Sequence, residues 1–161
     1  MSLDEALATL PNLLNSDQVI IALQDDNLAG FAGIQHGNQR LFSIRAQPFI
    51  KHLGIFRGLL VFVFLILFGR SYKDGELLMD GICVEKNLRG QGVGSLLLQE
   101  IFNFAQEKGY KSIRFDVVDT NPGARKLYER MGFEPTSHHS YPFVSRLMGF
   151  SASTTMTKKV V

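Results

Sequence analysis

The stretch of this sequence best suited to hold a phosphate is a glycine-rich turn between a strand and a helix. A short, mostly apolar run at 77–84 is bounded by charged and turn-forming residues and predicts a buried strand. Gly90, Gly92 and Gly94 follow, and glycine lets a backbone approach a ligand without Cβ clashes. A helical pattern begins at Val93, so free N–H groups and the positive end of a helix dipole would meet at one point. This combination predicts an anion site that suits a phosphate.

Two widespread phosphate-binding loops do not match this turn. A dinucleotide fingerprint needs the spacing G-x-G-x-x-G, and here the third glycine comes one residue early. A P-loop ends in Gly-Lys-Ser/Thr, which the turn does not contain. The spacing that stands here is Arg89-x-x-Gly92-x-Gly94, and the alternative interpretation is a purely structural reversal of the chain.

The segments after the turn predict a helix and then a strand. Apolar residues recur at helical spacing from Val93 to Ala105, and Gly109 is typical of the residue that follows a helix. The run at 111–118 alternates between apolar and polar residues, as a strand does, and places Asp116 on the face opposite the apolar set. The helix is therefore expected to pack on a sheet that contains this strand.

A second helix is marked at both ends by its sequence. Asn121 suits the N-cap, Pro122 the first helical position, and Gly132 the residue after the helix. Tyr128 lies on the apolar stripe of this helix, which faces the body of the protein. Taken alone, Tyr128 could equally be a core aromatic residue whose hydroxyl finds a partner.

The N-terminal part predicts a helix followed by a hairpin. Residues 3–14 show a helical apolar stripe that a proline interrupts. The runs 19–23 and 28–34 read as two strands joined by a turn that contains Asp25 and Asp26. These two acids are typical of a solvated turn, and metal ligation is the alternative.

The longest apolar run, Leu59–Phe68, has ten apolar residues in succession. A bilayer span needs about 20 such residues, and extension of this run meets Arg57 on one side and Arg70 on the other. We therefore expect no membrane span but a buried segment, part of which could form a homodimer interface or a face for a partner or acceptor.

The C-terminal part predicts one further strand. The run 151–161 alternates loosely and suits a closing strand. His138 and His139 are expected in a solvated loop, because successive side chains of an extended segment point in opposite directions and cannot share one site.

Composition limits the protein class. With 161 residues, 45% of them hydrophobic, the chain is long enough for one domain with a substantial core, expected over 1–161. A formal charge of +2 without a basic run makes nucleic acid an unexpected partner. Cys83 is the single cysteine, which excludes an intrachain disulfide, and no Cys/His cluster has metal-ligand spacing. The first residues do not resemble a signal peptide, and we expect a cytoplasmic protein.

A second motif makes the pattern specific. Asn121–Phe133 reads N-x-x-A-x-x-x-Y-x-x-x-G-F. With the R-x-x-G-x-G turn it resembles the two conserved blocks of the GNAT N-acetyltransferases, here within 77–109 and 111–133. The resemblance implies a mixed α/β fold: six or seven mostly antiparallel strands, helices on both faces, and two central parallel strands, 77–84 and 111–118, that splay apart. The front departs from the family, which usually opens with a strand and two helices.

The resemblance also implies the ligands and their binding residues. The acyl donor would be acetyl-CoA, with no metal, and the acceptor an amine whose identity the sequence does not give. Backbone groups at 82–84 would bind the pantetheine arm, the loop at 89–95 would hold the pyrophosphate, and Asn121 and Tyr128 would lie near the thioester. The donor-site residues so implied are Ile82, Cys83, Val84, Arg89, Gly90, Gln91, Gly92, Val93, Gly94, Ser95, Asn121, Ala124 and Tyr128.

Proton transfer sets the catalytic expectations. An amine with a pKa of about 10 must lose a proton before it attacks a thioester, so a carboxylate, directly or through water, is useful as a general base. Asp116, Asp80 and Glu76 are the candidates on strands, although each could also be an ordinary exposed strand residue. Tyr128 is the candidate acid for the departing thiolate if its pKa is somewhat lowered, and a backbone N–H near Val84 would hold the oxyanion.

Two functions of other classes fit the same sequence. The chain could bind acyl-CoA without turning it over, in which case no amine would release free thiol from the donor. It could instead dock onto a membrane or a partner through Leu59–Phe68, which co-sedimentation with liposomes would detect.

Overall fold

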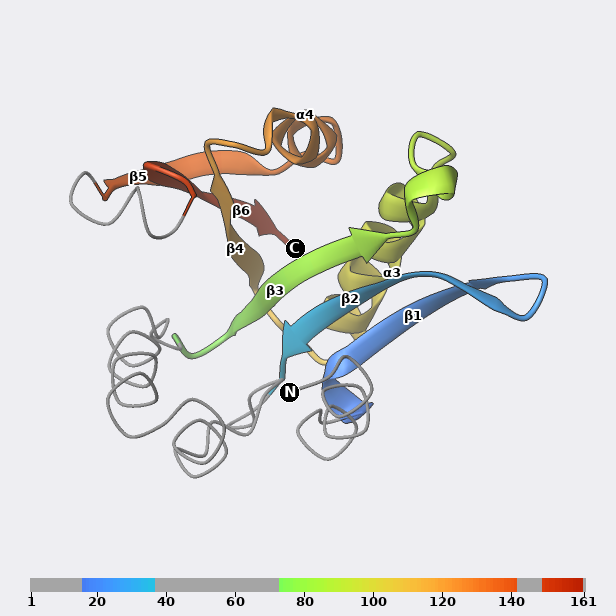
Figure 1. The fold of residues 1–161 in the computed structure, drawn as a ribbon. Coiled ribbons are helices and arrows are strands. Elements are labelled where there is room, and N and C mark those ends of the chain that lie inside the picture. The colour runs from blue at the N-terminus through green and yellow to red at the C-terminus, as the bar shows by residue number, and fades with distance from the viewer. Residues whose placement is uncertain (1–15, 37–72, 142–148, 161) are drawn as a thin grey trace, which may run out of the picture.

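The computed structural model describes residues 16–36, 73–141 and 149–160 (Figure 1). In this part of the chain, six strands form one sheet beside two α-helices. The described elements are η2 (Ser16–Gln18), β1 (Val19–Gln24), β2 (Asn27–Gln35), β3 (Glu76–Val84), η3 (Lys86–Leu88), α3 (Val93–Glu107), β4 (Ser112–Val118), α4 (Pro122–Arg130), β5 (Glu134–Ser140) and β6 (Ala152–Lys159). The hairpin, the two helices and the strands expected near 77–84, 111–118 and 151–161 are thus confirmed.

The sheet has the order β1-β2-β3-β4-β6-β5, and only β3 and β4 run parallel. Their pairing is short, because Glu76–Leu78 lies beside Ser112–Arg114 and no later pair forms between them. Beyond this point β3 continues along β2 and β4 continues along β6, so the two halves of the sheet diverge (Figure 1). The mixed, mostly antiparallel sheet and its splayed central strands, both predicted, are confirmed.

The core explains why the two halves stay together despite the short pairing. Helix α3 packs against β1, β2, β3 and β4, and its Leu97 and Ile101 are buried. On β4, the ring of Phe115 meets that of Tyr128 at 4.3 Å and that of Phe133 at 4.9 Å, both in edge geometry. Burial of such aromatic side chains contributes about 1.5–3 kcal/mol each, so α4 is anchored to β4 rather than to β3.

The β1–β2 hairpin turns through two residues with unusual backbone angles. Asp25 has φ 51° and Asp26 has φ 59°, and Gln24 pairs directly with Asn27. Positive φ at both central residues is what a type I′ turn requires, and Asx residues tolerate it better than most. The turn conformation therefore accounts for Asp25 and Asp26 at these two positions. Among the described residues there is no group of three or more potential metal ligands.

Asp26→Gly is expected to raise the free energy of unfolding by roughly 0.5–1 kcal/mol, because glycine adopts positive φ without the Cβ clash that an L-residue bears there. Urea unfolding followed by circular dichroism measures the change. Asp26→Ala is the control: it keeps a Cβ and should be no more stable than the parent. A loss of stability in Asp26→Gly would contradict the turn assignment.

The expected loop around the two histidines is instead strand β5. The strand lies at the edge of the sheet and pairs only with β6, with His138 opposite Thr154 and His139 opposite Ser153. All seven of its residues are exposed, so no buried face imposes the alternating pattern by which a strand is usually predicted. The two histidines do differ in direction, as expected: Nδ1 of His138 contacts Thr154, whereas Nε2 of His139 contacts Ser137.

Two further predictions lie outside the described residues: the helix at 3–14 and the apolar run within 42–69. Among the described helices, none combines the length and apolar character that a membrane crossing needs. The homodimer interface suggested for the apolar run stays a prediction.

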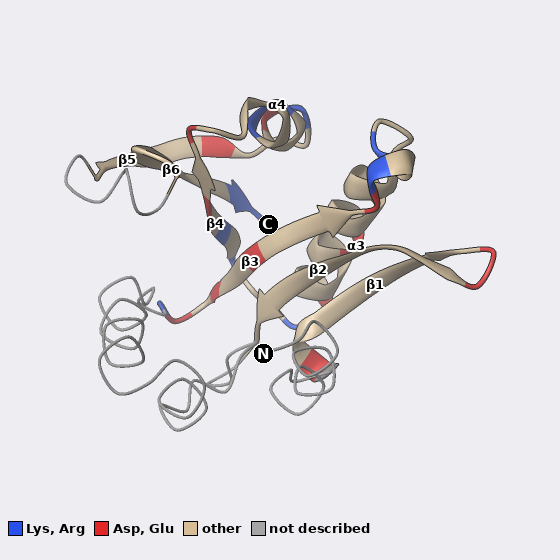
Figure 2. Cartoon of the chain, in the orientation of Figure 1, with Lys and Arg blue, Asp and Glu red and all other residues tan. Residues whose placement is uncertain are grey.

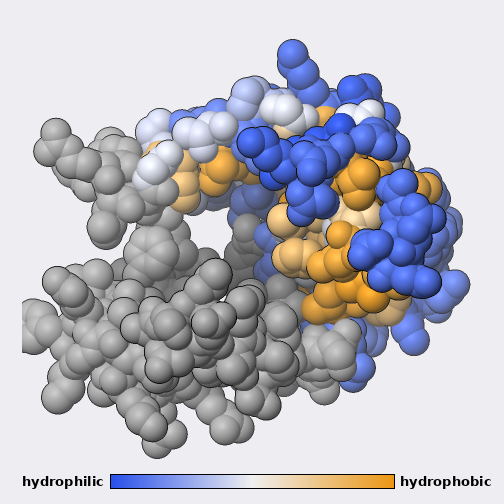
Figure 3. All heavy atoms as spheres, turned by 45° about the vertical axis from the view of Figure 1, so that its right-hand side comes forward, coloured by the Kyte–Doolittle hydropathy of each residue, from blue (hydrophilic) through white to orange (hydrophobic). Residues whose placement is uncertain are grey.

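The hairpin carries exposed apolar side chains of its own. Ile21 stands opposite Phe31 and Leu23 opposite Leu28, and all four are more than 40% exposed. Figure 3 shows apolar surface bordered by hydrophilic residues on the face that it presents. The described residues thus include an exposed apolar set on the β1–β2 hairpin.

Candidate functional site

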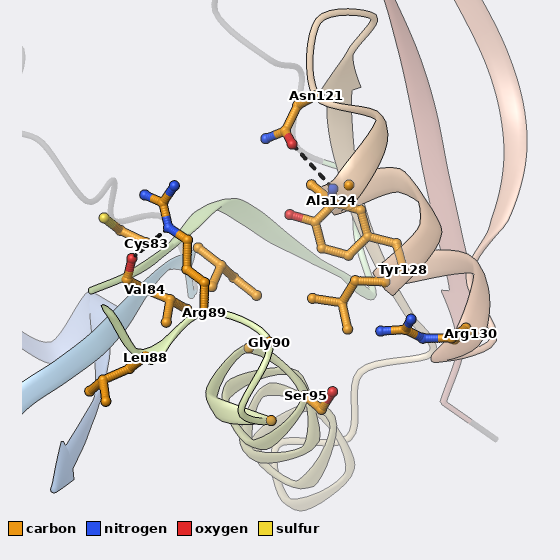
Figure 4. Close-up of a pocket in the computed structure, with 15 residues that line it drawn as sticks. Cys83, Val84, Leu88, Arg89, Gly90, Ser95, Asn121, Ala124, Tyr128 and Arg130 are labelled. Carbon is orange, nitrogen blue, oxygen red and sulfur yellow. Dashed lines mark hydrogen bonds between the residues drawn. The ribbon is translucent and has the colours of Figure 1, made fainter. Parts of the chain in front are cut away.

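A pocket of about 620 Å³ lies where β3 and β4 separate (Figure 4). Its walls come from the end of β3, from the loop and first turn of α3, and from α4. The lining residues are Ile82, Cys83, Val84, Leu88, Arg89, Gly90, Gly92, Gly94, Ser95, Asn121, Gly123, Ala124, Leu127, Tyr128 and Arg130. The glycine turn and the second motif, which the sequence separates by about 30 residues, thus form opposite walls of one cavity.

The loop wall depends on two glycines for different reasons. Gly92 is the N-cap of α3 with φ 91°, a conformation that favours glycine, and its carbonyl accepts from the N–H groups of Ser95 and Leu96. A Cβ on Gly94 would lie 3.0 Å from Cδ2 of Leu127, so glycine allows α3 and α4 to approach closely. The first N–H groups of a helix have no intrahelical partner, and those of Val93 and Gly94 are therefore the ones a phosphate could use.

The β3 wall offers an open strand edge. From Met79 onward β3 pairs with β2 on one side only, because β4 has diverged. The peptide groups at 82–84 that do not serve β2 can thus hydrogen-bond an extended ligand as a neighbouring strand would. Arg89 closes this wall, since its Nε donates to the carbonyl of Val84 at 3.2 Å.

The α4 wall presents Asn121 and Tyr128. The side-chain oxygen of Asn121 accepts from the N–H of Ala124 at 3.1 Å, which confirms the predicted N-cap. Tyr128 is only 7% exposed, and its hydroxyl points into the gap between α4 and β3 (Figure 4). Burial raises the pKa of the phenol above its ordinary value, so the lowered pKa that would suit a proton donor does not occur. The phenol therefore stays protonated at neutral pH.

The pocket includes all the predicted donor-site residues except Gln91 and Val93. Gln91 donates its side-chain amide to the carbonyl of Asn87, and Val93 is buried in the core, so neither side chain faces the cavity. Four lining residues were not predicted: Leu88, Gly123, Leu127 and Arg130. Gly123 and Arg130 stand two residues from Asn121 and Tyr128 respectively, on another side of the helix, so the spacing of the second motif did not indicate them.

The three predicted acids stand outside the lining and differ in their partners. Glu76 lies within the paired part of β3 and forms an ion pair with Nε of Arg114 at 3.0 Å. Asp80 and Asp116 each stand two residues beyond the last β3–β4 pair, on β3 and β4 respectively. Asp80 accepts from Nε2 of Gln35 at 2.8 Å, and Asp116 from Oγ1 of Thr155 at 2.6 Å. Two carboxylates therefore flank the opening between the strands.

A β-bulge distinguishes Asp80. Gly33 pairs with Gly81 and Ile34 with Met79, which leaves Asp80 as the extra residue of β3. Bulges bend a strand and redirect side chains, and they are frequent beside active sites. Asp80 therefore breaks the regular alternation of the strand whose end lines the pocket.

Asp119, at the end of β4, anchors the loop that leads to α4. Ser151 donates to the Asp119 carboxylate from its hydroxyl and from its backbone N–H. The Ser151 hydroxyl hydrogen bond lowers the pKa of Asp119 below its ordinary value. A lowered folded-state pKa stabilises the protein above the unfolded pKa, and this contribution is lost as the pH falls through the folded value.

A splayed parallel strand pair, with a glycine loop opening a helix at its mouth, defines the class of this fold. The chain belongs to the Acetyltransferase (GNAT) family, whose sequence model matches residues 3–133.

Its relatives bear names of the same kind. The chain is similar to N-acetyltransferase family 8 member 2 of Rattus norvegicus, with 30% identity over 76 residues, 47% of this chain and 34% of that protein. It is also 30% identical over 95 residues to the thialysine N-epsilon-acetyltransferase of Sus scrofa, which covers 56% of this chain and 53% of the relative. The matched stretch thus spans about a third to a half of the length of these relatives.

Solved structures support the fold. An N-acetyltransferase from Staphylococcus aureus superposes with a TM-score of 0.60 at 17% identity, over 100% of this chain and 79% of the other. A GNAT-family acetyltransferase from Streptococcus pneumoniae gives 0.59 at 19% identity, over 100% and 78%. At such identities the likeness concerns the fold alone.

Proposed function

We propose that this chain transfers an acetyl group from acetyl-CoA to an amine by direct attack of the amine on the thioester. The observation that carries the proposal is the pocket, because it joins a phosphate-suited loop, an open strand edge and a protonated phenol in one cavity. A phosphate, an amide-bearing arm and a thioester occur in that order along acetyl-CoA. Membership of the GNAT family supports the same reaction.

In this proposal the donor lies along the pocket from α3 to the strand opening. The N–H groups at the start of α3 bind the pyrophosphate, and the peptide groups at 82–84 bind the amides of the pantetheine arm. The thioester then lies near Tyr128 and Asn121. A backbone N–H near Val84 donates to the oxyanion of the tetrahedral intermediate.

The chemical step needs a base and a stabilised leaving group. A carboxylate, Asp80 or Asp116, takes a proton from the ammonium form of the acceptor, directly or through water. The neutral amine nitrogen then bonds to the carbonyl carbon, and the C–S bond breaks with its electron pair on sulfur. The proton that remains on the nitrogen is lost to solvent, and the released thiolate takes a proton from solvent to give the free thiol. Because the pKa of Tyr128 is raised, we propose that its hydroxyl donates a hydrogen bond to the thiolate rather than surrendering its proton.

Tyr128→Phe tests this role. The variant keeps the ring that packs on Phe115 but removes the hydroxyl, so kcat should fall by about tenfold to a hundredfold, the worth of a hydrogen bond to a charged group. Donor Kd should barely change. Steady-state kinetics and calorimetry measure the two quantities, and Tyr110→Phe, outside the pocket, is the aromatic control. Full activity in Tyr128→Phe would mean that Tyr128 serves only as a core aromatic residue.

A screen of amines tests the proposed function as a whole. Purified protein is mixed with acetyl-CoA and a panel of small amines, amino acids and peptides, and free thiol release is followed against a no-acceptor blank. Amine-dependent release is the expected result. Donor binding without release by any amine would favour a non-catalytic acyl-CoA-binding module.

We further propose that the protein is located in the cytoplasm, since a lone cysteine suits a reducing compartment.

A further inference from the structure

Two cations line the pocket, and they come from opposite walls. Arg89 follows η3, whereas Arg130 ends α4, and no acid is among the lining residues. Figure 2 accordingly shows basic residues both near η3 and on α4. The cavity is therefore suited to a ligand with more than one anionic group.

The guanidinium of Arg130 is available to a ligand, whereas the nearby charged side chains of Arg125 and Glu129 are paired with each other. Glu129, the adjacent acid, pairs with Arg125 at 2.9 Å one turn earlier on α4. Within the described residues no ion pair involves Arg130, and its guanidinium points toward Ser95 and the first turn of α3 (Figure 4). Arg130 is exposed, so its charge bears little desolvation cost before a ligand arrives.

The N-terminus of α3 can serve only one of two separated phosphates. Its free N–H groups, those of Val93 and Gly94, converge on a single point. In the proposed function this point binds the pyrophosphate. Coenzyme A carries a second anionic group, a monoester phosphate on its ribose. A planar guanidinium matches such a group with two parallel hydrogen bonds.

We infer that Arg130 binds the ribose phosphate of the donor and thereby selects coenzyme A over its dephosphorylated form. This inference rests on the proposed function, because it concerns the same pocket and the same donor. Arg130 is here a specificity-determining residue: the N–H groups of α3 hold the pyrophosphate, and Arg130 beside them holds the ribose phosphate.

The test compares two ligands on the parent protein, on two Arg130 variants and on one control variant. Calorimetry measures Kd of coenzyme A and of dephospho-coenzyme A for the parent, Arg130→Gln and Arg130→Lys. Arg130→Gln should weaken coenzyme A by about tenfold to a hundredfold, as expected for charge-assisted hydrogen bonds, and leave dephospho-coenzyme A unchanged. Arg130→Lys should retain part of the preference, because it keeps the charge but not the planar fork. Lys126→Gln, also exposed on α4 but outside the pocket, is the control for net charge and should change neither Kd.

The outcomes separate this inference from the proposed function. Equal affinity of the parent for both ligands, or an equal loss of both in Arg130→Gln, overturns the role of Arg130 while donor binding still stands. Failure of the parent to bind either ligand overturns the proposed function and this inference with it. The thermal unfolding curve of each variant is compared with that of the parent, so that a loss of affinity is not mistaken for a loss of folded protein.

Discussion

Ser95→Glu is expected to weaken acetyl-CoA binding by more than about a hundredfold while the protein stays folded. Ser95 lines the pocket in the first turn of α3, where the pyrophosphate is proposed to lie. A carboxylate there would occupy the anion site and repel the phosphates at short range. The same carboxylate is favourable for the helix itself, because acids near a helix N-terminus complement its dipole.

Ser95→Gln is the matched control, since it adds the same bulk without the charge. Calorimetry with acetyl-CoA should show a moderate loss for Ser95→Gln and no measurable binding for Ser95→Glu, with similar unfolding curves for both. A substitution at Gly92 would be less informative, because a side chain at φ 91° strains the backbone whatever its charge. Equal affinities of the Glu and Gln variants would argue against a phosphate at this turn.

Local signals in the sequence were sufficient for most elements near the site. The Asn121 cap, the proline after it and Gly132 define α4 through interactions only three or four residues apart, and the structure reproduces them. The same holds for α3, which begins after Gly92 and ends before Gly109. Such boundaries depend on backbone groups of the helix itself, so tertiary contacts do not need to be known.

Features that depend on distant parts of the chain were harder to predict. Strand β5 exists because β6 offers it a partner, and its own exposed residues carry no alternating pattern. The raised pKa of Tyr128 reflects burial, and its ring packs against Phe115 of β4 and Phe133, which precedes β5. Arg130 lines the pocket at the end of α4, and the close approach of α4 to α3 relies on Gly94, which belongs to the other motif. Each depends on an arrangement that no short window of sequence records.

The choice between Asp80 and Asp116 is also a matter of tertiary geometry. Both flank the opening between β3 and β4, and both accept a hydrogen bond from a neutral side chain. The residues that line the pocket include three from β3 and none from β4. Asp80 is the acid on the lining strand, and the bulge redirects it from the regular strand pattern. We therefore propose Asp80 as the general base and regard Glu76, which is paired with Arg114, as structural.

Asp80→Asn is expected to lower kcat/KM at neutral pH by about 10²–10⁴-fold, the usual contribution of a general base. The deficit should shrink as the pH rises toward about 10, because an amine acceptor then loses its proton to solvent without help. Donor Kd should change little, since the base acts on the acceptor. Rates measured from pH 6 to pH 10 with an amine found by the screen reveal the profile.

Asp116→Asn is the matched variant, because the same substitution is made at the same distance beyond the last β3–β4 pair. It should lose far less activity and keep the pH profile of the parent. A reversed outcome, with the pH-dependent deficit in Asp116→Asn alone, would assign the base to β4. A loss in Asp80→Asn that stays constant across the pH range would mean that Asp80 shapes the site without removing a proton. Stability curves for both variants at pH 7 and pH 10 exclude unfolding as the cause, because a loss of folded protein would affect donor binding and rate together.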